Sequence, residues 1–158
     1  MPRRPLALLT LAALCALAPL PLTAQRPLRA SGAQGITFGT LLPGVATTVS
    51  PADAARAARF DVTGTRGARV EIVLGLPTTL AGPGATIPLA FSSTSAAYSQ
   101  GGAGAGMTLF DPRQPYTGTL SNTGRASILL GATVLPAGGQ RPGSYSNVVT
   151  ITVADLSQ

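Results

Sequence analysis

Hydrophobic and polar positions alternate with a period of two in several short runs of this chain. In the stretch ARVEIVLG, Val70, Ile72 and Leu74 fall on one parity, while the charged residues Arg69 and Glu71 fall on the other. Such alternation is typical of a β-strand with one buried face. No run keeps a helical period over three turns, so the pattern predicts an all-β chain.

Similar runs recur along the chain and predict about seven or eight short strands. They lie within residues 35–40, 45–50, 59–64, 69–76, 86–91, 115–119, 125–135 and 145–153. Turns rich in Gly and Pro separate them, which is typical of a sandwich or barrel, and no connection is long enough to cross over between parallel strands. Pro88 has no N–H to donate, so the strand that contains it is predicted at a sheet edge.

The last run raises the question of what pairs with it. Tyr145, Val149, Ile151 and Val153 share one parity, and the run carries no charged residue. A strand of this kind is prone to aggregation unless another strand covers its edge. Two partners are open: the segment Ile36–Thr40 of the same chain, or a strand of another molecule. These four residues are therefore a candidate assembly edge.

The first 24 residues have the pattern of a secretory signal peptide. A basic MPRR precedes an apolar run that ends in prolines and small residues, and we expect cleavage near Ala24 or Gln25. Residues 25–34 are expected to form a flexible N-terminal extension, and residues 35–158 a single sandwich domain. The protein is expected to be exported to the periplasm, the cell surface or the medium, with no membrane span in the mature chain.

The residues that follow the expected cut offer little for catalysis. They include no His, Cys or Lys, which removes the usual general bases, thiol nucleophiles, amines and zinc ligands. Asp61 and Glu71 are expected on neighbouring strands beside Arg59 and Arg69, where ion pairing explains them more simply than acid–base chemistry. We therefore expect no enzyme, no catalytic residue, no cofactor and no metal site.

Two further stretches suggest sites only superficially. The glycines of GGAGAG do not lead into a helix, as a phosphate-binding loop requires, so residues 92–107 are predicted to be a long surface loop. Asp111 lacks the clustered carboxylates and amides of a calcium loop. Nine scattered arginines against five carboxylates leave residues 25–158 with a net charge of +4. Nucleic acid is not expected as a partner, although attraction to anionic cell-surface polymers is.

Three groups of residues occur in an order that resembles a known family. They are, in chain order, Phe38–Gly39, then Phe60, Val62, Gly64, Leu76 and Pro77, and finally Gly143, Tyr145 and Val149–Val153. This order resembles secreted bacterial pilin-like domains of unknown function (the domain of unknown function 4402 type). That family is similar in turn to spore coat protein U subunits of archaic chaperone–usher pili. The resemblance covers about residues 35–155.

The resemblance implies an antiparallel immunoglobulin-like sandwich with a structural or adhesive role at the bacterial surface. It also implies assembly by strand addition, with the protein itself or a periplasmic chaperone and usher as partners. Leu28 and Ala30 are the apolar positions of the N-terminal segment that could act as a donor strand. The alternative is a secreted ligand-binding module that recognises polysaccharide or another protein through residues 92–115.

Overall fold

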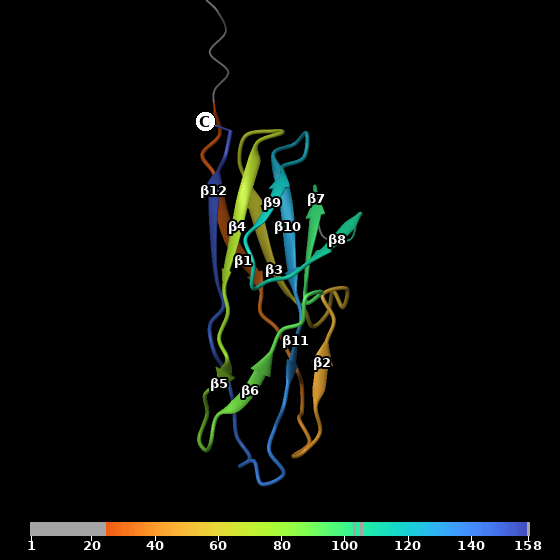
Figure 1. Ribbon diagram of the computed structural model, residues 1–158, viewed down its shortest axis with the longest axis vertical. Coiled ribbons are helices and arrows are strands. Elements are labelled where there is room, and N and C mark those ends of the chain that lie inside the picture. The colour runs from red at the N-terminus through yellow and green to blue at the C-terminus, as the bar shows by residue number, and fades with distance from the viewer. Residues whose placement is uncertain (1–24, 103, 105, 158) are drawn as a thin grey trace, which may run out of the picture.

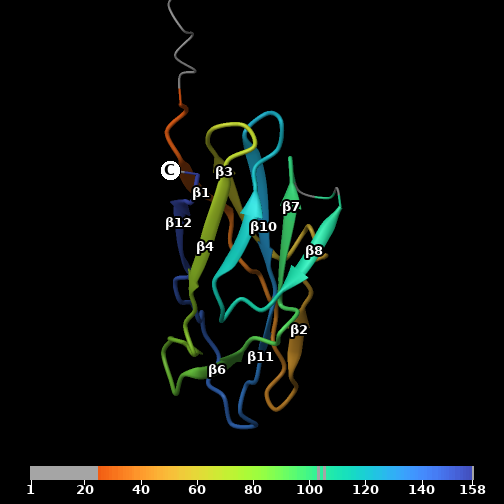
Figure 2. The same ribbon diagram turned by 45° about the horizontal axis from the view of Figure 1, so that its top comes forward.

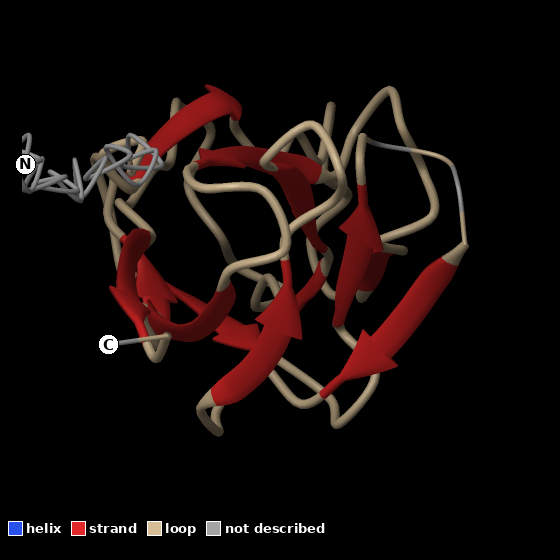
Figure 3. Ribbon diagram, turned by 90° about the horizontal axis from the view of Figure 1, so that it is seen from above, coloured by secondary structure: helices blue, strands red, loops and turns tan. Residues whose placement is uncertain are grey.

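The computed structural model describes residues 25–102, 104 and 106–157, and within these residues it contains twelve strands and no helix (Figures 1 and 3). The expected signal peptide lies outside the described residues. The strands are β1 (Arg29–Gln34), β2 (Thr47–Val49), β3 (Ala58–Thr63), β4 (Arg69–Gly75), β5 (Thr79–Leu80), β6 (Ile87–Ala90), β7 (Ala96–Gln100), β8 (Met107–Phe110), β9 (Tyr116–Thr119), β10 (Arg125–Leu130), β11 (Ala132–Val134) and β12 (Thr150–Asp155). The all-β prediction is confirmed, with more and shorter strands than expected.

The strands form three antiparallel sheets. A five-stranded sheet has the order β1-β3-β10-β7-β8 and packs against a three-stranded sheet, β12-β4-β9. The third sheet, β2-β11-β6-β5, lies at the lower end in Figure 1 and has a smaller core of its own. Gly131 alone separates β10 from β11, so the chain runs directly from the first sheet into the third.

The order of the strands is that of an immunoglobulin-like sandwich. In that fold one sheet has the order A-B-E-D, and the other contains C, F and G. Here β1-β3-β10-β7 reproduces the first sheet, and β4 and β12 take the places of C and F. Among the described residues no strand lies on the free side of β12, where G would be.

The core explains why the alternating runs became strands. Val70, Ile72 and Leu74 of β4 are all buried, as predicted from their parity, and they face Phe60 and Val62 of β3 across the interior. Burying a side chain of this size stabilises the fold by about 1.5–3 kcal/mol. The apolar positions of the alternating run are therefore the residues that β4 turns towards the core.

The two strands β3 and β4 are not a hairpin within one sheet, contrary to the simplest interpretation of their sequence. The turn between them carries the chain from the five-stranded to the three-stranded sheet. Asp61 and Glu71 therefore do not lie side by side, and the expected cross-strand ion pairs are absent from the described residues. Arg59 instead approaches Asp61 on its own strand, with 3.5 Å between Nε and the carboxylate. Asp61 also accepts a hydrogen bond from Ser127 at 2.9 Å.

Residues 92–107 are not the long surface loop that their composition predicts. They contain β7, whose first four residues are buried, and which lies between β10 and β8. Small side chains suit this position because Ala96, Ala97 and Ser99 let neighbouring strands and the opposite sheet approach closely. The connection to β8 is confined to residues 101–106.

The strand that contains Pro88 is not an edge strand either. β6 has β11 on one side and β5 on the other. The second neighbour is only two residues long, and Pro88 lies opposite Thr79 there. The carbonyl of Pro88 accepts a hydrogen bond from the backbone of Leu135 at 3.0 Å, so a residue without an N–H still contributes to the sheet.

The N-terminal segment enters the sandwich earlier than expected. Residues 29–34, expected to belong to a flexible extension, form β1 on the edge of the five-stranded sheet, with Arg29 opposite Thr63 and Gly32 opposite Phe60. The register shifts between Gly32 and Gln34, which marks a bulge. The sandwich therefore begins at Arg29.

Within the chain, the partner of the last strand is β4. Thr150 pairs with Gly75 and Asp155 with Val70, so the interpretation that placed it beside Ile36–Thr40 is wrong. That segment has no strand in the structure, and its backbone is held elsewhere, since the N–H of Thr37 donates to the carbonyl of Arg56 at 2.9 Å. No helix in the described part of the chain is long and apolar enough to cross a membrane.

Candidate functional site

The two sheets leave an open seam between β1 and β12. Each of these strands forms a ladder on one side only, β1 with β3 and β12 with β4. The two lie near each other on the same side of the sandwich, run in opposite directions, and share no ladder (Figures 1 and 2). Edge strands present unpaired N–H and C=O groups. The seam therefore offers backbone hydrogen bonds to an added strand on both sides.

The apolar interior reaches the surface along this seam. Ile72 of β4 is 1% exposed, and Val153, which lies opposite it on β12, is only half-buried. Leu74 and its partner Ile151 show the same contrast. On the other side of the seam, β1 covers little, because the first five of its six residues are exposed. The core is closed at β4 and open at β12.

A groove continues the seam towards the lower end of the molecule. It consists of two adjoining clefts of about 450 and 620 Å³, which share Ile36, Phe38, Leu80 and Tyr145. The first cleft is lined by Gly32, Ala33, Gln34, Gly35, Ile36, Phe38, Ala58, Phe60, Pro77, Leu80, Leu89, Tyr145, Ser146, Asn147 and Val149. None of these side chains is charged, so the first cleft suits an apolar, extended segment better than acid–base or metal chemistry.

One wall of the groove is held by Tyr145. Its hydroxyl donates to the carbonyl of Arg141 at 2.9 Å and accepts a hydrogen bond from the amide of Gln140 at 2.8 Å. The ring lies so close to Gly82 that a Cβ there would come within 2.4 Å of it. This packing resembles the tyrosine corner of Greek-key sandwiches, in which the hydroxyl bonds to the backbone a few residues upstream.

The next two residues, Ser146 and Asn147, fix the same wall to β5 and the residue that follows it. The backbones of Ser146 and Ala81 exchange two hydrogen bonds of 2.9 Å, and the side-chain amide of Asn147 donates to the carbonyl of Thr79 at 2.7 Å. The wall is therefore formed before any partner binds. The opposite wall, residues 32–38, is held by the pairing of β1 with β3, by the side-chain amide of Gln34, which donates to the carbonyl of Ala57 at 2.9 Å, and by the N–H of Thr37.

The structure places the four residues of the candidate assembly edge on one side of the groove. Tyr145 and Val149 line the first cleft, and Ile151 and Val153 follow along β12, all four half-buried. Sequence reasoning missed the floor of the groove, because Phe60 looked like an ordinary core residue. It also missed the small residues of the β1 wall, for which the only signal is their lack of bulk.

The two residues of the candidate donor segment are both engaged within the domain. Leu28 is half-buried and packs against the main core, near Gly64. Ala30 lies in β1, opposite Val62. A donor role for these residues would therefore require β1 to leave β3.

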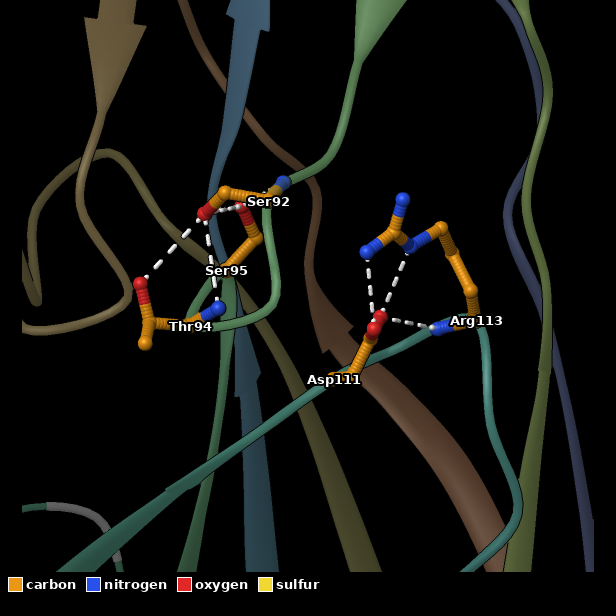
Figure 4. A network of polar contacts seen from close by, with 5 residues as sticks. All are labelled: Ser92, Thr94, Ser95, Asp111 and Arg113. Carbon is orange, nitrogen blue, oxygen red and sulfur yellow. Dashed lines mark hydrogen bonds and ion pairs between the residues drawn. The ribbon is translucent and has the colours of Figure 1, made fainter.

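The segment proposed for ligand binding, residues 92–115, contains β7 and β8 and two local polar networks (Figure 4). The hydroxyls of Ser92 and Ser95 lie 2.9 Å apart and close one turn. The guanidinium of Arg113 binds both carboxylate oxygens of Asp111 at 2.8 and 2.9 Å, and this pairing lowers the pKa of Asp111 and raises that of Arg113. These side chains satisfy one another. No residue of this segment lines either of the two clefts described above.

Carboxylates do not gather elsewhere in the described residues, where no group of three or more His, Cys, Asp or Glu side chains could hold a metal ion. Asp53 pairs with Arg56 at 2.7 Å, and this hydrogen bond lowers the pKa of Asp53. Among the described residues, the one strongly shifted pKa inside the core is that of Tyr98. Burial, with a smaller contribution from Tyr116, raises its pKa to about 12, and its hydroxyl donates to the carbonyl of Thr119 at 2.7 Å.

Fold and site together define an immunoglobulin-like β-sandwich with an apolar groove along an unpaired seam. The chain belongs to the family described as domain of unknown function DUF4402, whose model matches residues 29–154. The match begins at the first residue of β1 and ends within β12, so both borders of the seam belong to the family domain. No curated protein matches the chain.

Proposed function

We propose that this protein is an exported, non-enzymatic structural subunit that accepts an extended strand of another polypeptide in the groove between β1 and β12. The observation that carries the proposal is the incomplete burial of the inner row of β12. Val153 and Ile151 are half-buried, although their partners on β4, Ile72 and Leu74, are buried. An added strand would bury this row and pair with both edges.

Three further features support the proposal. The uncharged lining of the first cleft fits alternate apolar side chains of an incoming strand. The wall at Tyr145 and Asn147 is fixed in advance, which reduces the entropy lost on binding. The resemblance of the sequence to spore coat protein U and chaperone–usher subunits points to the same mode of assembly, with the periplasm or cell surface as its setting.

The partner strand is expected to come from a separate polypeptide, either a second copy or a periplasmic assembly factor. A second copy that donated residues 28–34 would have to release its own β1 first. That release is feasible because β1 is an edge strand and buries no large side chain apart from the neighbouring Leu28. Exchange of β1 between copies would then link them head to tail.

A covalently attached strand tests the groove directly. Residues 25–158 are extended by a short Asn-Gly turn and an alternating Val/Thr strand, which can fold back antiparallel to β12 and fill the seam. The extension should raise the melting temperature by about 10 °C, because about 3 kcal/mol of apolar burial and strand pairing is gained. It should also keep the protein monomeric where the unextended chain forms oligomers with rising concentration.

The matched control has the same turn and length with Ser in place of every Val. It should stabilise the domain by much less than the Val/Thr strand. Equal melting temperatures for the two extended forms, with a monomeric unextended chain at every concentration, would contradict the proposal. Light scattering after size-exclusion chromatography and thermal unfolding by circular dichroism provide both readings.

A further inference from the structure

Eight of the nine arginines in the described residues fall into two groups, and the ninth, Arg141, lies in the connection between β11 and β12. Arg56, Arg59 and Arg113 form ion pairs with Asp53, Asp61 and Asp111. Five others form no ion pair among the described residues and gather at the end of the sandwich where β1 begins and β12 ends. They are Arg26, Arg29, Arg66, Arg69 and Arg125, called here the basic end, and all five are exposed. Positive charge is thus concentrated at one end of an otherwise sparsely charged molecule, where Asp155, the last residue of β12, is the neighbouring carboxylate.

The centre of the basic end is a row across three strands. Arg29 of β1 and Arg125 of β10 both lie opposite Thr63 of β3, one on each side. Residues directly opposite each other in a sheet project from the same face. Because neighbouring strands are about 4.8 Å apart, the Cα atoms of the two arginines are about 10 Å apart. Both guanidinium groups leave the same face of the five-stranded sheet.

Two touching turns bring further arginines to this row. The N–H of Gly64 donates to the carbonyl of Gly124 at 2.9 Å, which joins the β3–β4 turn to the turn before β10. Arg66 lies in the first of these turns. Next to it, the N–H of Arg26 donates to the hydroxyl of Thr65 at 3.0 Å, which fixes Arg26 at the same end. The positions of these arginines are therefore set by backbone contacts, while their side chains form no ion pair with any other described residue.

We propose that the basic end binds an anionic polysaccharide through its carboxylate groups. Planar guanidinium groups bind carboxylates with two parallel hydrogen bonds, and several of them at a fixed spacing can bind successive charged units of a polymer. The exposed neighbours in the two turns include Asn122 and Thr123, which can hydrogen-bond to sugar hydroxyls.

A lipid surface fits this end less well. Membrane-binding surfaces combine basic residues with large apolar side chains that enter the bilayer. The exposed positions of the two turns are Arg66, Gly67, Asn122 and Thr123, and none is apolar and large. Leu156, whose N–H donates to the carbonyl of Arg69 at 2.8 Å, is also exposed at this end, but one apolar side chain does not make the apolar face that membrane insertion needs. Arg29 borders the seam as the first residue of β1, whereas Arg66 and Arg125 lie outside it, so polysaccharide binding does not require strand addition.

The test measures binding of residues 25–158 to alginate, a polymer of uronic acids, with neutral dextran and vesicles containing phosphatidylglycerol as comparison probes. Wild-type protein should bind alginate at low salt and release it at high salt, and it should not bind dextran. Replacing both Arg29 and Arg125 by Gln should weaken alginate binding about tenfold, because two charge-assisted contacts are lost.

The control replaces Arg113 and Arg141 by Gln, which removes the same net charge away from the basic end. It should change alginate binding less than about twofold. Equal losses in the two double variants would mean attraction by net charge alone and would overturn the proposal, as would absence of binding by the wild type. Vesicle binding tighter than alginate binding would overturn it in favour of a membrane.

Thermal unfolding shows whether either double variant is misfolded. If the Arg29 and Arg125 variant melts early, Arg26→Gln with Arg66→Gln replaces it, since both residues lie outside the strands. That pair should also weaken alginate binding, and an unchanged affinity would count against the basic end.

Discussion

Val153 of β12 lies directly opposite Ile72 of β4, yet only Ile72 is fully buried. Ile72→Ala should therefore destabilise the domain by about 3 kcal/mol, since it leaves a cavity in a closed part of the core. Val153→Ala should lower the free energy of unfolding by only about 1 kcal/mol, because the position is already partly solvated. Urea unfolding of both variants checks the difference, and equal losses would mean that the seam is closed.

The same seam should be visible in amide exchange. The N–H groups of β1 and β12 that face away from β3 and β4 have no ladder partner among the described strands, so they should exchange faster than those of β3 and β10. Hydrogen–deuterium exchange with mass spectrometry measures this. Attaching the Val/Thr strand should slow exchange in β1 and β12 together, and slowing in only one of them would indicate that the strand binds outside the seam.

A glycine substitution should damage the wall of the groove. Gly82→Ala places a Cβ within 2.4 Å of the Tyr145 ring, which must move, and a loss of about 2 kcal/mol is expected. Gly35 also lines the first cleft, but a Cβ there would meet nothing within 4 Å. Gly35→Ala is therefore the control and should leave the melting temperature nearly unchanged. Similar losses for both would show that the Tyr145 wall is not rigid.

Alkaline pH should destabilise the core through Tyr98. Its pKa is about 12 in the folded protein and about 10 in the unfolded chain, so its contribution to stability is complete below pH 10 and is lost as the pH rises through 12. Tyr98→Phe removes the hydrogen bond to Thr119 and should weaken the fold by about 1 kcal/mol at neutral pH. The variant should show a smaller further loss between pH 10 and 12 than the wild type in urea unfolding, and an identical loss would contradict this account.

Acid should act on the exposed pair of Asp111 and Arg113. The pKa of Asp111 is lowered in the folded state, so its contribution is present above the ordinary value of 3.8 and disappears as the pH falls through the folded value. Asp111→Asn should therefore lower the melting temperature slightly at neutral pH and have no effect at a pH below the pKa of Asp111 in the folded state. Asp53→Asn, which breaks a similar exposed pair with Arg56, is the matched comparison.

How far the sequence predicts this molecule depends on which residues carry the signal. Strands such as β4 and β12 are predicted because bulky and polar side chains alternate along them. β7 is missed, because Ala96, Ala97 and Ser99 are buried by close packing of small groups, and small groups are also typical of loops. When the buried side chains of a strand are this small, the sequence shows no alternation of large apolar and polar residues.

The candidate site is predictable only on one side. The apolar parity of Val149, Ile151 and Val153 predicts an edge that needs cover, and the structure places these residues along the groove. Which strand lies beside them is not encoded locally, because alternation identifies a face of a strand and not its neighbour. Long-range packing determines that β12 pairs with β4 and that the chain passes between sheets after β3. Both features were absent from the sequence-based prediction.

The pairing of β12 with β4 has a consequence for synthesis. Val70 and Asp155 are neighbours in the ladder but are separated by most of the domain along the chain. A chain that emerges from a ribosome or a translocation channel with its N-terminus first makes β4 early and β12 last. Until β12 arrives, one edge of β4 and the apolar row at Ile72 have no cover on that side. The domain therefore completes its second layer only once β12 has emerged, and a factor that binds apolar strand edges would be needed most during that interval.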